Sequence, residues 1–87
     1  MKSGWKPEII EVVLENISNH KEGITKTQLM YKSLLSYIQL VEYLTILRKS
    51  GLIEYRPSST TYKTTKRGFR LLQMTKEMNQ LVMTGKI

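Results

Sequence analysis

The chain of 87 residues contains no cysteine, no aspartate and only one histidine, His20. Without cysteine it can form neither disulfide bonds nor thiolate zinc sites, and it has no thiol nucleophile. The lone His20 has no second histidine or cysteine with which to hold a metal ion. Glycine-rich phosphate loops and nucleophile elbows are also absent from the sequence. We therefore expect no metal, no cofactor and no enzymatic activity.

Long apolar runs are missing as well. No segment approaches the roughly 18 apolar residues that a membrane-spanning helix needs, and the start MKSGWKPEII lacks the continuous apolar stretch of a signal peptide. Hydrophobic residues make up 40% of the chain and charged residues 24%, which is typical of a folded globular protein. We expect a cytoplasmic protein without a membrane partner, folded as one small domain.

Negative charge is scarce in the last third of the chain. The net charge is +7, but residues 1–54 carry seven basic against six acidic residues, a net charge of +1. Residues 55–87 carry seven basic residues against Glu77 alone, a net charge of +6. This asymmetry favours a polyanionic partner, because lysine and arginine replace the counterions condensed around phosphates. The alternative is a charge that only keeps the protein soluble.

The first part of the chain reads as a helix, a loop and a second helix. Pro7 suits a first helical turn, and the apolar residues that follow predict a helix to about Ser18. A polar loop then ends in glycine, and Ile24 could form a very short strand. Thr25 and Gln28 have the spacing of a capping box, which starts a helix that ends around Lys32.

A second capping box, Ser36 with Gln39, follows after only a few residues. The next helix carries one apolar stripe at the spacing i, i+4, i+7, made of Leu40, Leu44 and Leu47. Gly51 is expected to end this helix. Two short helices joined by such a short turn predict a helix-turn-helix.

The remainder predicts a hairpin and a last helix. Residues 52–56 and 61–64 are rich in strand-forming types, and the segment 57–60 between them is a turn. Thr65 can then cap a C-terminal helix over about 65–84. The expected order is helix, short strand, helix, helix, two-stranded hairpin and helix.

Two segments, ITKTQLMYKSLLSYIQLVEYLTILRKSGLIEY and YKTTKRGFRLL, resemble archaeal winged helix-turn-helix DNA-binding proteins and putative transcriptional regulators. These include a small type that dimerises through a C-terminal coiled coil. The resemblance covers roughly residues 8–75. It implies a mainly α fold with a small β-hairpin, in a single domain over 1–87 whose core spans about 6–70. It also implies a nucleoid-associated homodimer that binds double-stranded DNA as a transcriptional regulator or chromatin-associated protein.

In such folds the third helix enters the major groove of DNA. With the leucine stripe turned inward, the face available to bases consists of Tyr37, Ile38, Val41, Glu42 and Thr45, and Ser36 precedes it. This face is poor in positive charge, although aliphatic side chains can contact thymine methyl groups. The alternative is a winged-helix module that binds a protein partner through Ile38 and Val41, with weak or no specific DNA binding.

Basic residues are expected to contact the phosphate backbone. Arg56 and Lys63 lie on the hairpin, or wing, and Lys66, Arg67 and Arg70 lie in the first turns of the last helix. Lys26 and the free N–H groups at the starts of the second and third helices could add further phosphate contacts. A solvated cationic face without a ligand is the alternative.

The last helix carries two apolar stripes. Phe69 and Leu72 are expected to pack on the core of the domain. The other stripe has the spacing of a short coiled-coil seam and predicts a dimer interface, made of Leu71, Met74, Met78 and Leu81. Alternatively, this stripe covers its own domain. No effector pocket can be recognised in the sequence.

Overall fold

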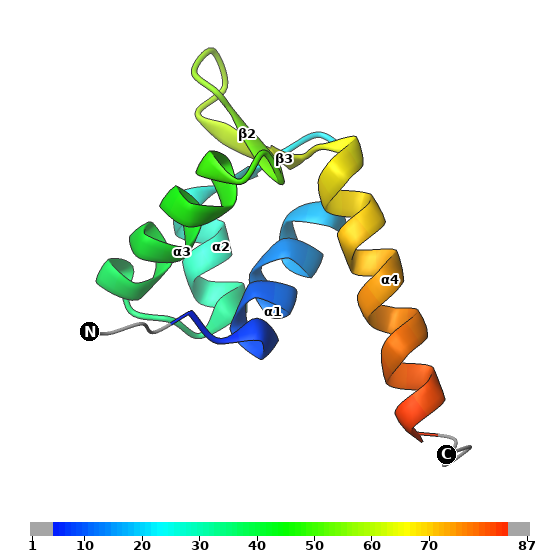
Figure 1. Cartoon of the computed structure of the whole chain (residues 1–87). Coiled ribbons are helices and arrows are strands. Elements are labelled where there is room, and N and C mark those ends of the chain that lie inside the picture. The colour runs from blue at the N-terminus through cyan, green and yellow to red at the C-terminus, as the bar shows by residue number, and fades with distance from the viewer. Residues whose placement is uncertain (1–4, 84–87) are drawn as a thin grey trace.

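A computed structural model describes residues 5–83 as four helices and three short strands (Figure 1). The elements follow one another as α1 Pro7–Ser18, β1 Ile24–Thr25, α2 Lys26–Ser33, α3 Tyr37–Lys49, β2 Ile53–Arg56, β3 Thr61–Thr64 and α4 Lys66–Met83. The order of elements confirms the one expected from the sequence. Among residues 5–83 no helix is both long and apolar enough to cross a membrane.

Both predicted capping boxes are present. The Gln28 backbone N–H donates to Thr25 Oγ1 (3.2 Å), and the Thr25 N–H donates to Gln28 Oε1 (3.1 Å). Ser36 and Gln39 repeat this exchange at the start of α3, with both distances at 3.2 Å. Each box satisfies two N–H groups that a helix start leaves without partners. These two short sequence patterns therefore fix where α2 and α3 begin.

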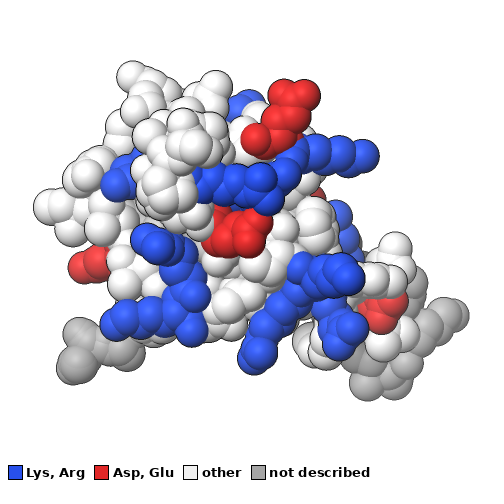
Figure 2. Space-filling model, turned by 90° about the horizontal axis from the view of Figure 1, so that it is seen from above, with Lys and Arg blue, Asp and Glu red and all other residues white. Residues whose placement is uncertain are grey.

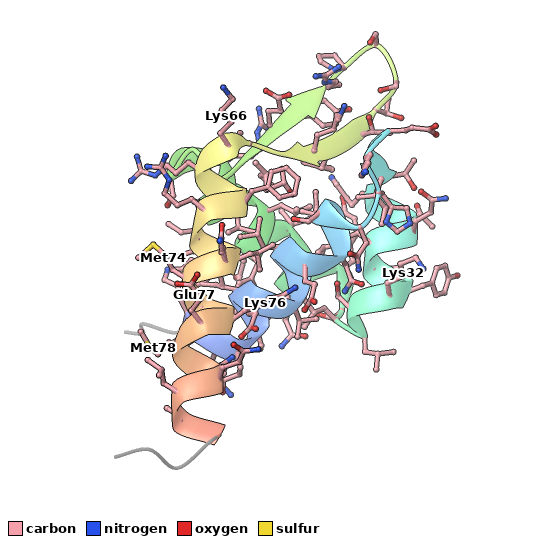
Figure 3. The ribbon with its side chains drawn as sticks, turned by 90° about the vertical axis from the view of Figure 1, so that its right-hand side faces the viewer. Lys32, Lys66, Met74, Lys76, Glu77 and Met78 are labelled. Atoms are coloured by element: carbon pink, nitrogen blue, oxygen red, sulfur yellow. The ribbon has the colours of Figure 1, made fainter. Side chains whose placement is uncertain are left out.

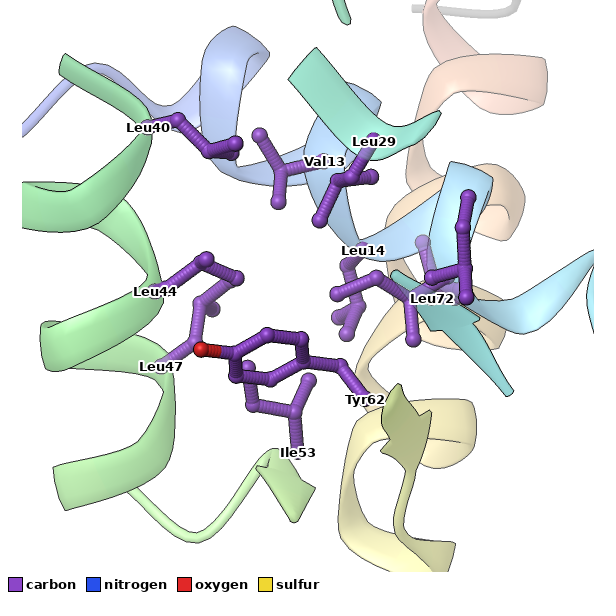
Figure 4. Packing of buried hydrophobic residues seen from close by; sticks show 11 residues of the cluster. Val13, Leu14, Leu29, Leu40, Leu44, Leu47, Ile53, Tyr62 and Leu72 are labelled. Atoms are coloured by element: carbon purple, nitrogen blue, oxygen red, sulfur yellow. The ribbon is translucent and has the colours of Figure 1, made fainter. Parts of the chain in front are cut away.

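The core lies where α3 faces α1. Leu40, Leu44 and Leu47 are all buried and point toward Val13 and Leu14 (Figure 4). Ile53, Tyr62 and Leu72 close the cluster from the wing and from α4. Full burial of one such aliphatic side chain stabilises the fold by roughly 1.5–3 kcal/mol. The leucine stripe predicted from the sequence therefore forms part of the hydrophobic core of the domain.

The sheet has three strands in the order β1-β3-β2, all antiparallel. The sequence predicted the hairpin and a separate short strand, and the structure pairs the two. Tyr62 of β3 lies opposite Ile24 on one side and Tyr55 on the other. This pairing joins the first residues of β3 to the start of the helix-turn-helix.

Helix α4 starts at a polar cap and runs past the rest of the domain (Figure 1). Leu72 is buried in the core, as expected. The expectation for Phe69 was wrong, because its side chain is 49% exposed. Leu72 takes the place in the core, while Phe69 lines a shallow hollow at the end of α1 with Ser18.

Candidate nucleic-acid interface

The outer face of α3 is open to solvent and carries little charge. Tyr37 is 57% exposed and Ile38 is 71% exposed, and Val41 is half-buried. Glu42 and Thr45 are exposed, and the Thr45 hydroxyl donates to the Val41 carbonyl (2.8 Å). The five predicted residues thus share one accessible helix face, whose only charged member is an acid.

The starts of α2 and α3 lie close together. The Lys26 ammonium group sits 5.4 Å from the centre of the Tyr37 ring, which is within the range of a cation–π contact. Ser36 uses its hydroxyl to cap α3, where it accepts the Gln39 N–H. Lys26 therefore belongs beside the outer face of α3, and the Ser36 hydroxyl is already engaged as a cap.

The wing carries its charges on one face. Arg56 donates to the Glu54 carboxylate at 3.1 Å, and Lys63 is the strand partner of Glu54. Both side chains of the ion pair are about half exposed (51% each). The sequence did not predict this pair, which offsets part of the Arg56 charge. Lys63 contributes the other positive charge of the wing.

The first turns of α4 hold three basic residues, Lys66, Arg67 and Arg70, all exposed. None of them has a carboxylate within ion-pair distance among residues 5–83. Arg67 and Arg70 line a hollow of about 430 Å³ together with Ser50 and Leu52. Figure 2 looks onto the wing end of the molecule, and blue side chains are spread over this face with fewer red ones among them.

One further basic residue, Arg48, joins this region through the tertiary structure. Arg48 at the end of α3 lies over the Tyr55 ring of the wing, 5.5 Å from its centre. Lys49 follows it and is exposed, but it lines a hollow beside Trp5 and Thr45. Their positions in sequence indicated only a favourable cationic last turn. The Arg48 contact depends on where β2 lies, so spacing alone gives no signal for it.

The predicted dimer stripe divides into two parts. Leu71 is half-buried and packs against the core of its own domain. Met74, Met78 and Leu81 are 57%, 64% and 65% exposed. In Figure 3, Met74 and Met78 project from one edge of α4, whereas Lys76 lies on the other side, where it pairs with Glu15 of α1 (3.4 Å). The exposed part of the stripe therefore starts at Met74.

Within residues 5–83, no group of three or more histidine, aspartate or glutamate side chains is placed to hold a metal ion.

Comparison with known proteins agrees with this architecture. No curated protein matches the chain. A family model described as winged helix-turn-helix matches residues 5–83, which is most of the chain. The chain therefore belongs to the winged helix-turn-helix family.

Proposed function

We propose that this protein binds double-stranded DNA, with α3 in the major groove and with the wing and the start of α4 on the phosphate backbone. The proposal includes a role as a transcriptional regulator or as a chromatin-associated protein of the nucleoid. No catalytic step is part of the proposal. It is supported by the winged helix-turn-helix family and by the charge of the wing end.

The unpaired basic residues at the start of α4 are the observation that carries the proposal. Lys66, Arg67 and Arg70 have no carboxylate partner among the described residues, and Lys63 of the adjoining strand adds to them. Phosphate contacts of this kind supply much of the affinity of a protein for DNA. They position the protein, whereas base contacts from α3 would specify the sequence.

The test measures duplex binding by fluorescence anisotropy over a series of salt concentrations. The triple variant Lys63→Ala, Lys66→Ala and Arg67→Ala should bind more weakly and depend less on salt. Each lost phosphate contact lowers the slope of log affinity against log salt by about 0.9. We therefore expect a slope flatter by roughly 2–3.

A matched triple variant controls for net charge. Lys21→Ala, Lys32→Ala and Lys76→Ala removes the same three charges from exposed positions outside the wing and the start of α4. It should change the salt slope much less than the first variant. Equal effects of the two triple variants, or binding that does not respond to salt, would refute the proposed interface.

A second candidate function is favoured by the apolar side chains around the start of α3. Ile38 and Leu34 are 71% and 91% exposed, and such exposed apolar neighbours are typical of protein-binding surfaces. The variant Ile38→Lys separates the two functions. A DNA-binding α3 should keep or gain duplex affinity, because the new charge faces phosphates. In a protein-binding module the same change should abolish capture of the protein partner and leave the weak duplex affinity unchanged.

The same proposal includes a homodimer that presents two such units to DNA. Met74 and Met78 form an exposed apolar edge on α4 in the turns that follow its basic start. Helices with this spacing associate when their apolar edges meet. The exposed part is short, so the dimer would need additional contacts from the domain bodies.

A further inference from the structure

A hollow of about 580 Å³ lies between the N-terminal segment and α3. Trp5 and Ile9 line it from the N-terminal segment and α1, and Val41, Thr45 and Ile46 line it from α3. Pockets for small organic molecules commonly measure about 300–1,000 Å³ and have mainly apolar walls. The size and the lining of this hollow therefore fit a small ligand.

Tertiary contacts hold the N-terminal side of the hollow in place. The Lys6 backbone N–H donates to the Tyr43 hydroxyl at 3.0 Å. The Trp5 ring meets the Tyr43 ring edge to face, with centroids 5.1 Å apart and planes at 77°. Tyr43 is itself buried in α3. Trp5 is thus held beside α3 by a residue 38 positions later in the chain.

Three charged side chains also line the hollow, Lys6, Lys49 and Glu42. None of the three has an ion-pair partner among residues 5–83. Two ammonium groups against one carboxylate give the lining a net positive charge. Such a lining attracts an anion, and the apolar walls require that the anion also carry an apolar body.

We propose that this hollow binds a small amphipathic organic anion, a carboxylate or sulfonate on an aromatic or aliphatic body. The body packs against Trp5, Ile9 and Val41, and the acid group lies toward Lys49. Val41 and Thr45 belong to both the hollow and the outer face of α3. Ligand and duplex therefore compete for α3, a consequence that rests on the DNA-binding function proposed above.

The binding test uses 1-naphthoate as the probe and the whole chain labelled with ¹⁵N. Trp5 is the only tryptophan, so its indole N–H gives one assignable signal. Titration should shift this signal and the Val41 and Thr45 amide signals to saturation. The cation 1-naphthylmethylammonium should bind several-fold more weakly. Equal or tighter binding of the cation, or shifts confined to α4, would overturn the proposal.

Two charge variants test the proposed anion site, because they should change the naphthoate affinity in opposite directions. Lys49→Gln should weaken naphthoate binding about 2- to 5-fold, the range expected for one exposed ion pair. Glu42→Gln should strengthen it by a similar factor, because it removes the one carboxylate in the lining. Lys76→Gln removes the same charge as Lys49→Gln from a position outside the hollow and should leave the affinity nearly unchanged. Weaker binding by Glu42→Gln would contradict the assignment.

A separate experiment tests the competition between naphthoate and duplex. Failure of the anion site and failure of the DNA-binding function can then be distinguished. Saturating naphthoate should lower the duplex affinity of the natural chain, and Lys49→Gln should require more naphthoate for the same effect. Unchanged duplex affinity with naphthoate bound would refute the competition. A chain that binds naphthoate but no duplex would refute the DNA-binding function and leave the anion site established.

Discussion

At Gly68, α4 passes so close to the connection between α3 and β2 that a side chain has no space. A Cβ atom there would collide with the Leu52 carbonyl oxygen and lie 2.6 Å from Thr64 Cγ2. The Leu52 carbonyl also accepts the Thr65 N–H at 3.1 Å, so it cannot easily move aside. The glycine is needed for this approach of backbone to backbone.

The variant Gly68→Ala should therefore destabilise the protein. Inside a helix the change from glycine to alanine normally stabilises by roughly 0.5–1 kcal/mol. Here we expect the opposite sign, a loss of about 1–3 kcal/mol typical of overpacking, measured by urea unfolding. Gln73→Ala, on an exposed position of the same helix, should be nearly neutral. A stabilised Gly68→Ala would show that α4 lies further from Leu52.

At the scale of the element, α4 depends on one hydroxyl group at its start. Thr65 Oγ1 accepts the Gly68 N–H (3.1 Å) and donates to the Gly51 carbonyl (2.7 Å). The first contact caps the helix, and the second ties it to the end of α3. The cap thus holds the basic first turns of α4 at the wing end of the molecule.

Replacing Thr65 by alanine should cost about 0.5–2 kcal/mol in the free energy of unfolding, because both hydrogen bonds are lost. Duplex affinity should fall as well, since Lys66 and Arg67 follow directly. Thr65→Ser keeps the hydroxyl and should restore most of the stability in a thermal unfolding experiment. If serine and alanine destabilise equally, the hydroxyl is not the group that matters.

At the scale of the whole molecule, the charges and the apolar edge lie on different parts of α4. Its first turns belong to the basic wing end, and its later turns run past the domain with Met74 and Met78 exposed (Figures 1 and 3). This division would allow one helix to contact DNA at its start and a second copy further along. The proposed homodimer makes use of that separation.

Met78→Glu should therefore convert a dimer into a monomer, because a carboxylate in an apolar contact is not solvated. Sedimentation equilibrium would detect the change as a halved mass. The control Gln80→Glu adds the same charge to α4, but at a residue that lines the hollow with Ser18 and Phe69. It should leave the mass unchanged. A natural chain that is monomeric at all concentrations would rule out the dimer.

The features that could be predicted from the amino-acid sequence are those that depend on residues close together in the chain. Both capping boxes span three residues, and the leucine stripe of α3 spans seven, so the chain encodes them locally. The net charge of the last third is likewise a property of composition. These features predicted the order of the elements correctly, and with it the fold.

The features that join distant segments could not be predicted and emerge from the packing of the elements. The pairing of Ile24 with Tyr62, the contact of Trp5 with Tyr43 and the stacking of Arg48 on Tyr55 depend on how the elements pack. Phe69 and Leu72 have similar apolar character, and only packing against α1 buried one of them. Local patterns fix the ends and faces of the helices, whereas the burial of a side chain depends on which neighbours occupy the space around it.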